Sequence, residues 1–332
     1  MEADPTSLAW VPIGPQHAED ILTLTRAIEE NDGVPYRTSF DEVLGSFDSA
    51  YIWRAMAVWS ADGLIAYGLA RMPANHGEEA EVTLSGGVHP RFRNRGLGRR
   101  LLDIQLALAE EMVQGEVSAA GAIMHVDNQH QYLVDLLRRA SFSLHRSYVQ
   151  MRRSLSDPIE EAELPSFVTI EPLTDDLMDD VRHAHNSIYY ELAKMPPRSP
   201  EEWRSQRPNM EASWSFVAMD RRGDRPRVAG YLLSSRYEQD WEALGWSEGY
   251  VDEVAVYSQW REKGIMSALL RAAMRAYQND GMEFAGMDAD VDPHAVDPNG
   301  AVESYEYFGF EQVGYTHVMY RSLQIREAPR QD

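Results

Sequence analysis

The stretch HPRFRNRGLGRRLL, residues 89–102, places five arginines around two glycines in a chain whose formal net charge is -22. The segment before it, EVTLSGGV at 81–88, is typical of a strand. After it, the apolar residues Leu97, Leu101 and Leu108 recur at helical spacing. The stretch is therefore expected to be a loop that leaves a strand and opens a helix.

A loop of this kind favours an anion. The first N–H groups of a helix have no partner within it and lie at the positive end of its dipole. Gly96 and Gly98 carry no side chain, so a diphosphate can approach the main chain. The arginines that can add charge-assisted hydrogen bonds are Arg93, Arg95, Arg99 and Arg100. Other phosphate loops fit less well, because Leu101 replaces the third glycine of the dinucleotide fingerprint and no Gly-Lys-Ser/Thr follows.

The same pattern recurs 168 positions later. VYSQWREKGIMSALL at 256–270 aligns with residues 88–102 without a gap, and the register continues to Phe142 and Phe310. Such register indicates an internal repeat. We therefore predict two copies of one fold of the α/β (α+β) class. The predicted boundaries are 1–155 for the first copy, 156–166 for an acidic, proline-containing linker and 167–332 for the second copy.

Each copy shows the same order of elements. A helical stretch comes first, at 18–30 and at 175–193, and strands follow. Asp62-Gly63 and Gly223-Asp224 predict hairpin turns between strands. Another strand runs into the glycine loop, and a helix, a strand, a second helix and a last strand complete the copy.

Composition excludes several classes of protein. With no cysteine, disulfides, thiolate nucleophiles and zinc–cysteine sites are ruled out. The acidic balance argues against binding nucleic acid over a broad surface. No apolar run approaches the roughly 20 residues that cross a bilayer, and the N-terminal sequence is acidic. We expect a protein of the cytoplasm that binds neither nucleic acid nor membrane.

The hexapeptide RNRGLG at 93–98 resembles the Arg/Gln-x-x-Gly-x-Gly/Ala signature of the GNAT superfamily of N-acetyltransferases. The resemblance implies two tandem GNAT-like domains, each a mixed, mostly antiparallel sheet flanked by helices. It also implies that the loop holds the diphosphate of acetyl-coenzyme A, with the pantetheine arm along the preceding strand. The implied cofactor contacts are Val88, Arg93, Arg95, Gly96, Gly98 and Arg99 in the first copy and Val256, Arg261, Gly264, Met266 and Ser267 in the second. Met266 stands where the signature has glycine or alanine, so weaker binding is expected there.

The second copy carries the residues that the family uses for chemistry. NGAVESYEYFGF at 299–310 resembles the closing motif of the family, whose tyrosine, here Tyr305, protonates the departing thiolate. Glu253 matches a frequent family position for a general base that acts directly or through water. The first copy has Leu137 and Ser85 at the corresponding positions. The resemblance therefore predicts a catalytic second copy and a non-catalytic first copy.

The implied reaction is direct attack of a small-molecule amine on the thioester, since the chain has no cysteine for an acyl-enzyme. Antibiotic, polyamine, sugar and peptide amines remain open as acceptors, and so do a monomer and a homodimer. The alternative is a coenzyme A-binding sensor or scaffold without turnover.

Three further features are given lesser roles. The acidic run at 287–298 contains Asp288, Asp290, Asp292, His294 and Asp297, but Pro293 and Asn299 replace the glycine and glutamate of a calcium loop, so no metal is predicted. Its alternating aspartates would suit a cationic amine or a solvated strand end. Trp241 and Trp246 either wall the acceptor pocket or serve packing. His183 and His185 are two positions apart, which does not place both on one face of a helix.

Overall fold

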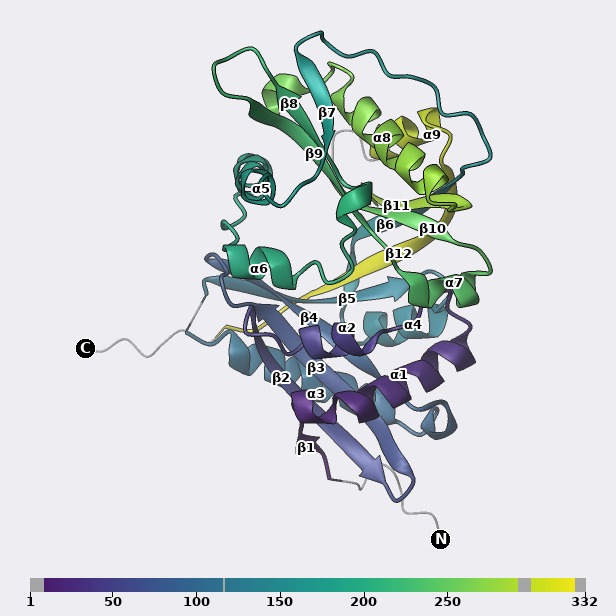
Figure 1. Cartoon of the computed structure of the whole chain (residues 1–332). Coiled ribbons are helices and arrows are strands. Elements are labelled where there is room, and N and C mark those ends of the chain that lie inside the picture. Colours follow the sequence, from purple (N-terminus) through teal and green to yellow (C-terminus); the bar gives the residue numbers. More distant parts are fainter. Residues whose placement is uncertain (1–8, 116, 292–299, 326–332) are drawn as a thin grey trace, which may run out of the picture. The chain divides into compact units, whose positions relative to one another are not determined.

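The computed structural model describes residues 9–115, 117–291 and 300–325 (Figure 1). The chain forms two compact units. Unit 1 comprises residues 1–146 together with 317–332, and unit 2 comprises residues 147–316. No described helix is long and apolar enough to span a membrane.

Unit 1 holds a sheet in the order β1-β2-β3-β4-β5-β12, whose last strand β12 (Glu311–Ser322) comes from late in the chain. The elements of this part of the chain are β1 (Val11–Pro12), α1 (Ala18–Asp32), α2 (Phe40–Gly45), β2 (Tyr51–Ser60), β3 (Gly63–Pro73), β4 (Glu79–Val88), α3 (Leu97–Met112), β5 (Ala119–Asp127) and α4 (Gln131–Arg139). Alternation along β3 fixes which helix covers which face. Leu69 packs with α1, whereas Ala70 and Met72 pack with α3 and α4. The sheet therefore lies between α1 and α3.

Unit 2 repeats this arrangement with the order β6-β11-β10-β9-β8-β7. Its elements are β6 (Ser143–Ser154), β7 (Val168–Pro172), α5 (Met178–Ala193), α6 (Pro200–Ser205), β8 (Phe216–Asp220), β9 (Arg227–Ser235), α7 (Glu238–Leu244), β10 (Glu248–Val256), α8 (Ile265–Asn279), β11 (Phe284–Val291) and α9 (Gly300–Tyr307). Tyr231 and Leu233 of β9 face α5, and Leu232 between them faces α8. Here too the sheet lies between two helices.

The local predictions of the sequence hold. β2 and β3 meet in a hairpin that pairs Ser60 with Gly63, and β8 and β9 meet in one that pairs Asp220 with Arg227. The mixed sheet is also confirmed, since β4 runs parallel to β5 and antiparallel to β3. The short helices α2, α6 and α7 were not predicted.

The last strand of each sequence copy pairs in the other unit. Residues 147–154 of β6 pair antiparallel with 284–291 of β11 in unit 2. At the end of the chain, Leu323 donates its N–H to the carbonyl oxygen of Ala120 in unit 1. The ring of Tyr320 in turn occupies the space where Gly121 has no side chain. The compact units therefore differ in extent from the sequence copies, whose boundaries at 155 and 167 remain a prediction.

Candidate functional site

The two glycine loops share one backbone conformation. Asn94 and Glu262, which correspond in the repeat, have φ angles of 59° and 61°. Gly96 and Gly264, the next corresponding pair, have φ angles of 82° and 76° and cap α3 and α8. Neither cap forms a side-chain hydrogen bond to its helix. The first N–H groups of both helices are thus available to an anionic ligand.

A cavity of about 440 Å³ lies at the loop of unit 2. Ile188, Tyr189 and Leu192 of α5 form part of its wall, and Phe308 forms another part. All the cofactor contacts predicted for the second copy line it, namely Val256, Arg261, Gly264, Met266 and Ser267. The fold therefore brings that predicted set together.

The strand that leads into this cavity has an unpaired edge. β10 pairs with β9 as far as Val256, but its register with β11 ends at Val251. In the described part of the chain, residues 252–256 therefore have no strand partner on the β11 side. An extended ligand with amide groups can pair with that edge as an added strand would. The pantetheine arm of coenzyme A has this chemistry, so the site fits the cofactor.

The equivalent cavity of unit 1 is larger, at about 750 Å³. It is lined by Val88, Arg93, Gly96, Gly98 and Arg99, whereas Arg95 lies elsewhere with its guanidinium 5.6 Å from the centre of the Phe92 ring. Its basic groups are partly engaged. Arg93 forms two hydrogen bonds with Asp32, at 2.5 and 2.9 Å, and Arg99 pairs with Asp103 at 3.2 Å. The main-chain N–H groups of the loop are therefore free for an anion, whereas Arg93 must exchange its pairing with Asp32 to bind one.

A β-bulge turns Glu253 toward α5. The pairing of β10 with β9 shifts between Val251 and Glu253. Val251 consequently packs on the α8 side, and Ala255 packs on the α5 side with Tyr231. Glu253 lies two residues from Ala255 and shares its face.

Both oxygens of Glu253 accept hydrogen bonds from protein groups. His185 Nδ1 lies 2.7 Å from Oε1, and the hydroxyl of Tyr231 donates to the same oxygen. Arg207 Nη2 lies 2.8 Å from Oε2. The Glu253 side chain is 13 % exposed, and that of Arg207 is 9 % exposed. A half-exposed surface pair would be screened by water, but this one is not.

The surroundings of Glu253 stabilise its charge. Burial opposes ionisation, but the hydrogen bond and charge of His185 and the charge of Arg207 outweigh burial and lower the pKa of Glu253 to about 2. Tyr189, which lines the cavity, has its pKa raised by burial and by Glu253. Tyr189 thus connects an ionised carboxylate with the cavity.

Tyr305 lies on α9, partly buried against the core of unit 2. Its ring meets Phe310 edge to face, with centres 6.4 Å apart. It does not line the 440 Å³ cavity, but Phe308 of the same motif does. Burial raises the pKa of Tyr305, so the hydroxyl keeps its proton at neutral pH.

Unit 1 has a different set of side chains at these places. Tyr67, which pairs with Gly87, corresponds to Tyr231, which pairs with Ala255. The Tyr67 hydroxyl lies 3.2 Å from Thr25 Oγ1. Leu137, at the position of Tyr305, is fully buried in the core.

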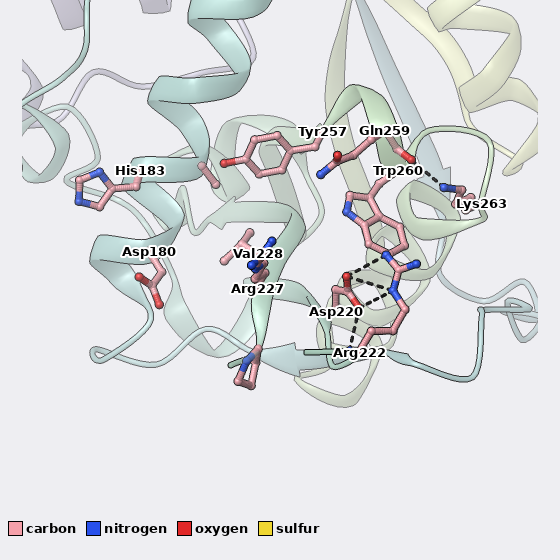
Figure 2. Close-up of a pocket in the computed structure, with 12 residues that line it drawn as sticks. Asp180, His183, Asp220, Arg222, Arg227, Val228, Tyr257, Gln259, Trp260 and Lys263 are labelled. Atoms are coloured by element: carbon pink, nitrogen blue, oxygen red, sulfur yellow. Dashed lines mark hydrogen bonds and ion pairs between the residues drawn. The ribbon is translucent and has the colours of Figure 1, made fainter. Parts of the chain in front are cut away.

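A second cavity of unit 2, about 660 Å³, lies beside the same loop (Figure 2). Trp260 lines both cavities. In Figure 2, Arg222 pairs with Asp220 at 3.0 Å, and Lys263 donates to the carbonyl oxygen of Gln259 at 2.7 Å. The wall of this 660 Å³ cavity therefore carries charges of both signs. None of the five cofactor contacts predicted for this copy lines it.

The remaining predicted features lie apart from the 440 Å³ cavity. Trp246 donates to Glu248 at 3.0 Å and packs against Phe284. Asp288 and Asp290 alternate on exposed positions of β11, whereas Asp292, His294 and Asp297 lie outside the described residues. His183 is exposed and pairs with Asp179 on its own helix, at 3.3 Å. In the described ranges, no group of three or more His, Asp or Glu side chains is arranged to hold a metal ion.

Sequence reasoning missed the partners of Glu253. The sequence pointed to His185 only as half of an improbable metal pair, and it gave no reason to single out Arg207 or Tyr231. These residues come from α5, the segment after α6, and β9, so no spacing links them in the sequence. A buried histidine on an otherwise apolar helix face was the one available signal.

Residues 178–310 match the model of the acetyltransferase (GNAT) family. This match lies within unit 2, and the chain as a whole has the fold of tandem GNAT proteins.

Its relatives agree with this class. The chain is 27% identical over 325 residues to a mycothiol acetyltransferase of Salinispora arenicola, covering 93% of this chain and 94% of the relative. A tandem GNAT protein from the clavulanic acid biosynthesis pathway has a similar structure, with a TM-score of 0.71, 14% identity and coverage of 97% and 100%. A GCN5-related N-acetyltransferase from Sphaerobacter thermophilus gives a TM-score of 0.68, 20% identity and coverage of 97% and 98%.

Proposed function

We propose that this protein transfers the acetyl group of acetyl-coenzyme A to the primary amine of a small molecule, and that unit 2 performs the chemistry. One observation carries the proposal: the five predicted cofactor contacts line one cavity, and Tyr189 joins that cavity to the ionised Glu253. Unit 1 offers Ser85 and Leu137 in place of Glu253 and Tyr305.

The loop and the open edge of β10 hold the cofactor. Main-chain N–H groups at the start of α8, with Arg261, bind the diphosphate. The pantetheine arm pairs with residues 252–256. Acetyl-coenzyme A also binds at the loop of unit 1, where the same backbone conformation recurs.

Glu253 then acts through water. An ammonium group must lose a proton before its nitrogen can attack, and a carboxylate with a pKa of about 2 holds a proton poorly. Glu253 therefore orients water that carries the proton away. The amine attacks the thioester carbonyl, the C–N bond forms and the C–S bond breaks. Tyr305 gives its proton to the leaving thiolate and recovers one from solvent.

The acceptor is a small amine. The name of the Salinispora arenicola relative points to a mycothiol precursor with a free amine as the first compound to test. We expect the full-length protein to form one amide bond per acetyl-coenzyme A consumed, seen as a mass increase of about 42 Da on the acceptor. A protein that binds acetyl-coenzyme A but acetylates none of the mycothiol precursor, polyamines, sugar amines and peptide amines would instead be a sensor or scaffold.

A further inference from the structure

Unit 1 contains a buried carboxylate that the chemistry of unit 2 does not use. Glu29 on α1 is 4% exposed and lines the 750 Å³ cavity. Its Oε1 accepts hydrogen bonds from the N–H of Thr38 at 3.0 Å and from the hydroxyl of Thr38 at 2.5 Å. Its Oε2 is buried and has no hydrogen-bond partner among the described residues.

Such a group is costly unless something completes its surroundings. A buried carboxylate needs a cation or further donors, and half of the hydrogen-bonding capacity of Glu29 is unmet. Within the described ranges Glu29 forms no ion pair. Of the three arginines that line the same cavity, Arg93 pairs with Asp32 and Arg99 with Asp103, and neither they nor Arg139 forms an ion pair with Glu29 among the described residues. Oε2 is thus a buried, unpartnered acceptor on a side chain that lines the cavity.

The neighbours of Glu29 suit a ligand with polar N–H groups. His130 also lines the cavity, and its Nε2 is buried without a partner. Asp127 and Tyr36, hydrogen-bonded to each other, line it as well. Asp127 thus offers a further acceptor in the same wall, and the cavity has the size of those that hold small molecules.

The place of Glu29 is fixed by close packing of α1 on β4. A Cβ at Gly87 would lie 2.6 Å from Cδ1 of Ile28, the residue before Glu29. Gly87 corresponds to Ala255, which lines the cavity of unit 2. Glu29 therefore stands beside the part of β4 that leads into the glycine loop.

We propose that the cavity of unit 1 binds a small molecule through its primary ammonium group, which donates a hydrogen bond to Oε2 of Glu29. This is a second amine site, separate from the acceptor site of unit 2 and independent of whether unit 2 is catalytic.

Each cavity contains one methionine that reports on it. Met124 lines the cavity of unit 1, and Met266 lines the cavity of unit 2. The test labels the methionine methyl groups of the full-length protein with ¹³C and follows both signals by NMR. The probes are glucosamine, cysteamine and putrescine, each against its neutral counterpart: glucose, mercaptoethanol and butane-1,4-diol.

We expect at least one amine to shift the Met124 signal with an affinity at least tenfold tighter than that of its neutral counterpart. Glu29→Gln should remove that preference. Glu30→Gln, which removes the same charge from an exposed position of the same helix, should keep it. The Met266 signal of the unliganded Glu29→Gln protein should match that of the wild type.

The proposal is overturned if no amine shifts Met124, if neutral compounds bind equally well, or if Glu29→Gln keeps the preference. The affinities of the amine and of the neutral compound are compared in the wild-type protein, so this comparison does not depend on whether a variant folds. Failure of the proposed acetyl transfer would show in product formation and leave the Met124 result unchanged.

Discussion

At the scale of single residues, the cluster around Glu253 is the most informative part of the molecule. A carboxylate this buried would ordinarily tend to be neutral. Here His185, Arg207 and Tyr231 satisfy both oxygens, so the charged form is the stable one. The cluster is therefore both a structural support and a fixed negative charge beside the 440 Å³ cavity.

This arrangement predicts how stability depends on pH. The pKa of Glu253 falls from its usual 4.5 to about 2, so its contribution to the free energy of unfolding is full above pH 4.5 and is lost as pH falls toward 2. The contribution is on the order of 3 kcal/mol. Glu253→Gln should destabilise the protein at pH 7, and urea denaturation should show the difference from wild type shrinking between pH 4.5 and 2. A difference that stays constant over this range would contradict the assignment.

Tyr305 gives a second prediction at this scale. Tyr305→Phe keeps the ring that packs near Phe310 and removes the hydroxyl proton. We expect kcat to fall by about 10²-fold or more, as for loss of a general acid, with little change in the affinity for acetyl-coenzyme A. Steady-state kinetics and calorimetric titration measure the two quantities. Unchanged turnover would remove Tyr305 from the mechanism.

At the scale of elements, the strand–loop–helix junction recurs in both units and is the proposed cofactor site. Position 264 requires a glycine for two reasons. Its φ angle is 76°, and a Cβ would lie 2.6 Å from the carbonyl oxygen of Glu163. The segment predicted as the linker therefore supports the loop from one side.

A matched pair of variants separates these two reasons. Gly245 ends α7 with a φ angle of 85° and has open space around its Cα. Gly245→Ala should cost about 1 kcal/mol of stability through backbone strain alone and leave cofactor affinity unchanged. Gly264→Ala should cost more and weaken acetyl-coenzyme A binding at unit 2. Equal effects of both variants on cofactor affinity would show that the contact with Glu163 is unimportant.

The elements also show how far sequence can predict the site. The loops, hairpins and long helices follow from local signals such as glycine spacing and apolar periodicity. The helices α2 and α6 have six residues each, too few for periodicity to reveal them. The network around Glu253 was not predictable, because the bulge that turns its side chain toward α5 arises from strand pairing and leaves no pattern in the sequence.

At the scale of the whole molecule, the two copies exchange their last strands. β11 pairs with residues 147–154 of the first copy, and β12 lies next to β5 in the sheet, with Leu323 directly after it donating to Ala120. The periodicity of a sequence repeat cannot reveal such an exchange, because the residue pattern of a strand does not depend on which sheet the strand joins. Neither sequence copy on its own contains the full set of strands of one unit.

The exchange predicts which fragment folds. Residues 147–316 include β6 and should give a soluble protein with a cooperative thermal transition. Residues 167–332 lack β6, so the edge of β11 is exposed and aggregation is expected. Circular dichroism and size-exclusion chromatography of the two fragments test this. A well-folded 167–332 fragment would show that the pairing of β6 with β11 is dispensable.

The central claim is that unit 2 transfers the acetyl group by means of Glu253 and Tyr305. The most direct measurement compares acetyl transfer to the mycothiol precursor by the wild type and by the double variant Glu253→Gln/Tyr305→Phe, with acetyl-coenzyme A binding measured on the same preparations. The account predicts that the double variant loses at least about 10³-fold in kcat and still binds the cofactor. Acetyl transfer at the wild-type rate by a double variant that is folded and loaded with cofactor would contradict it.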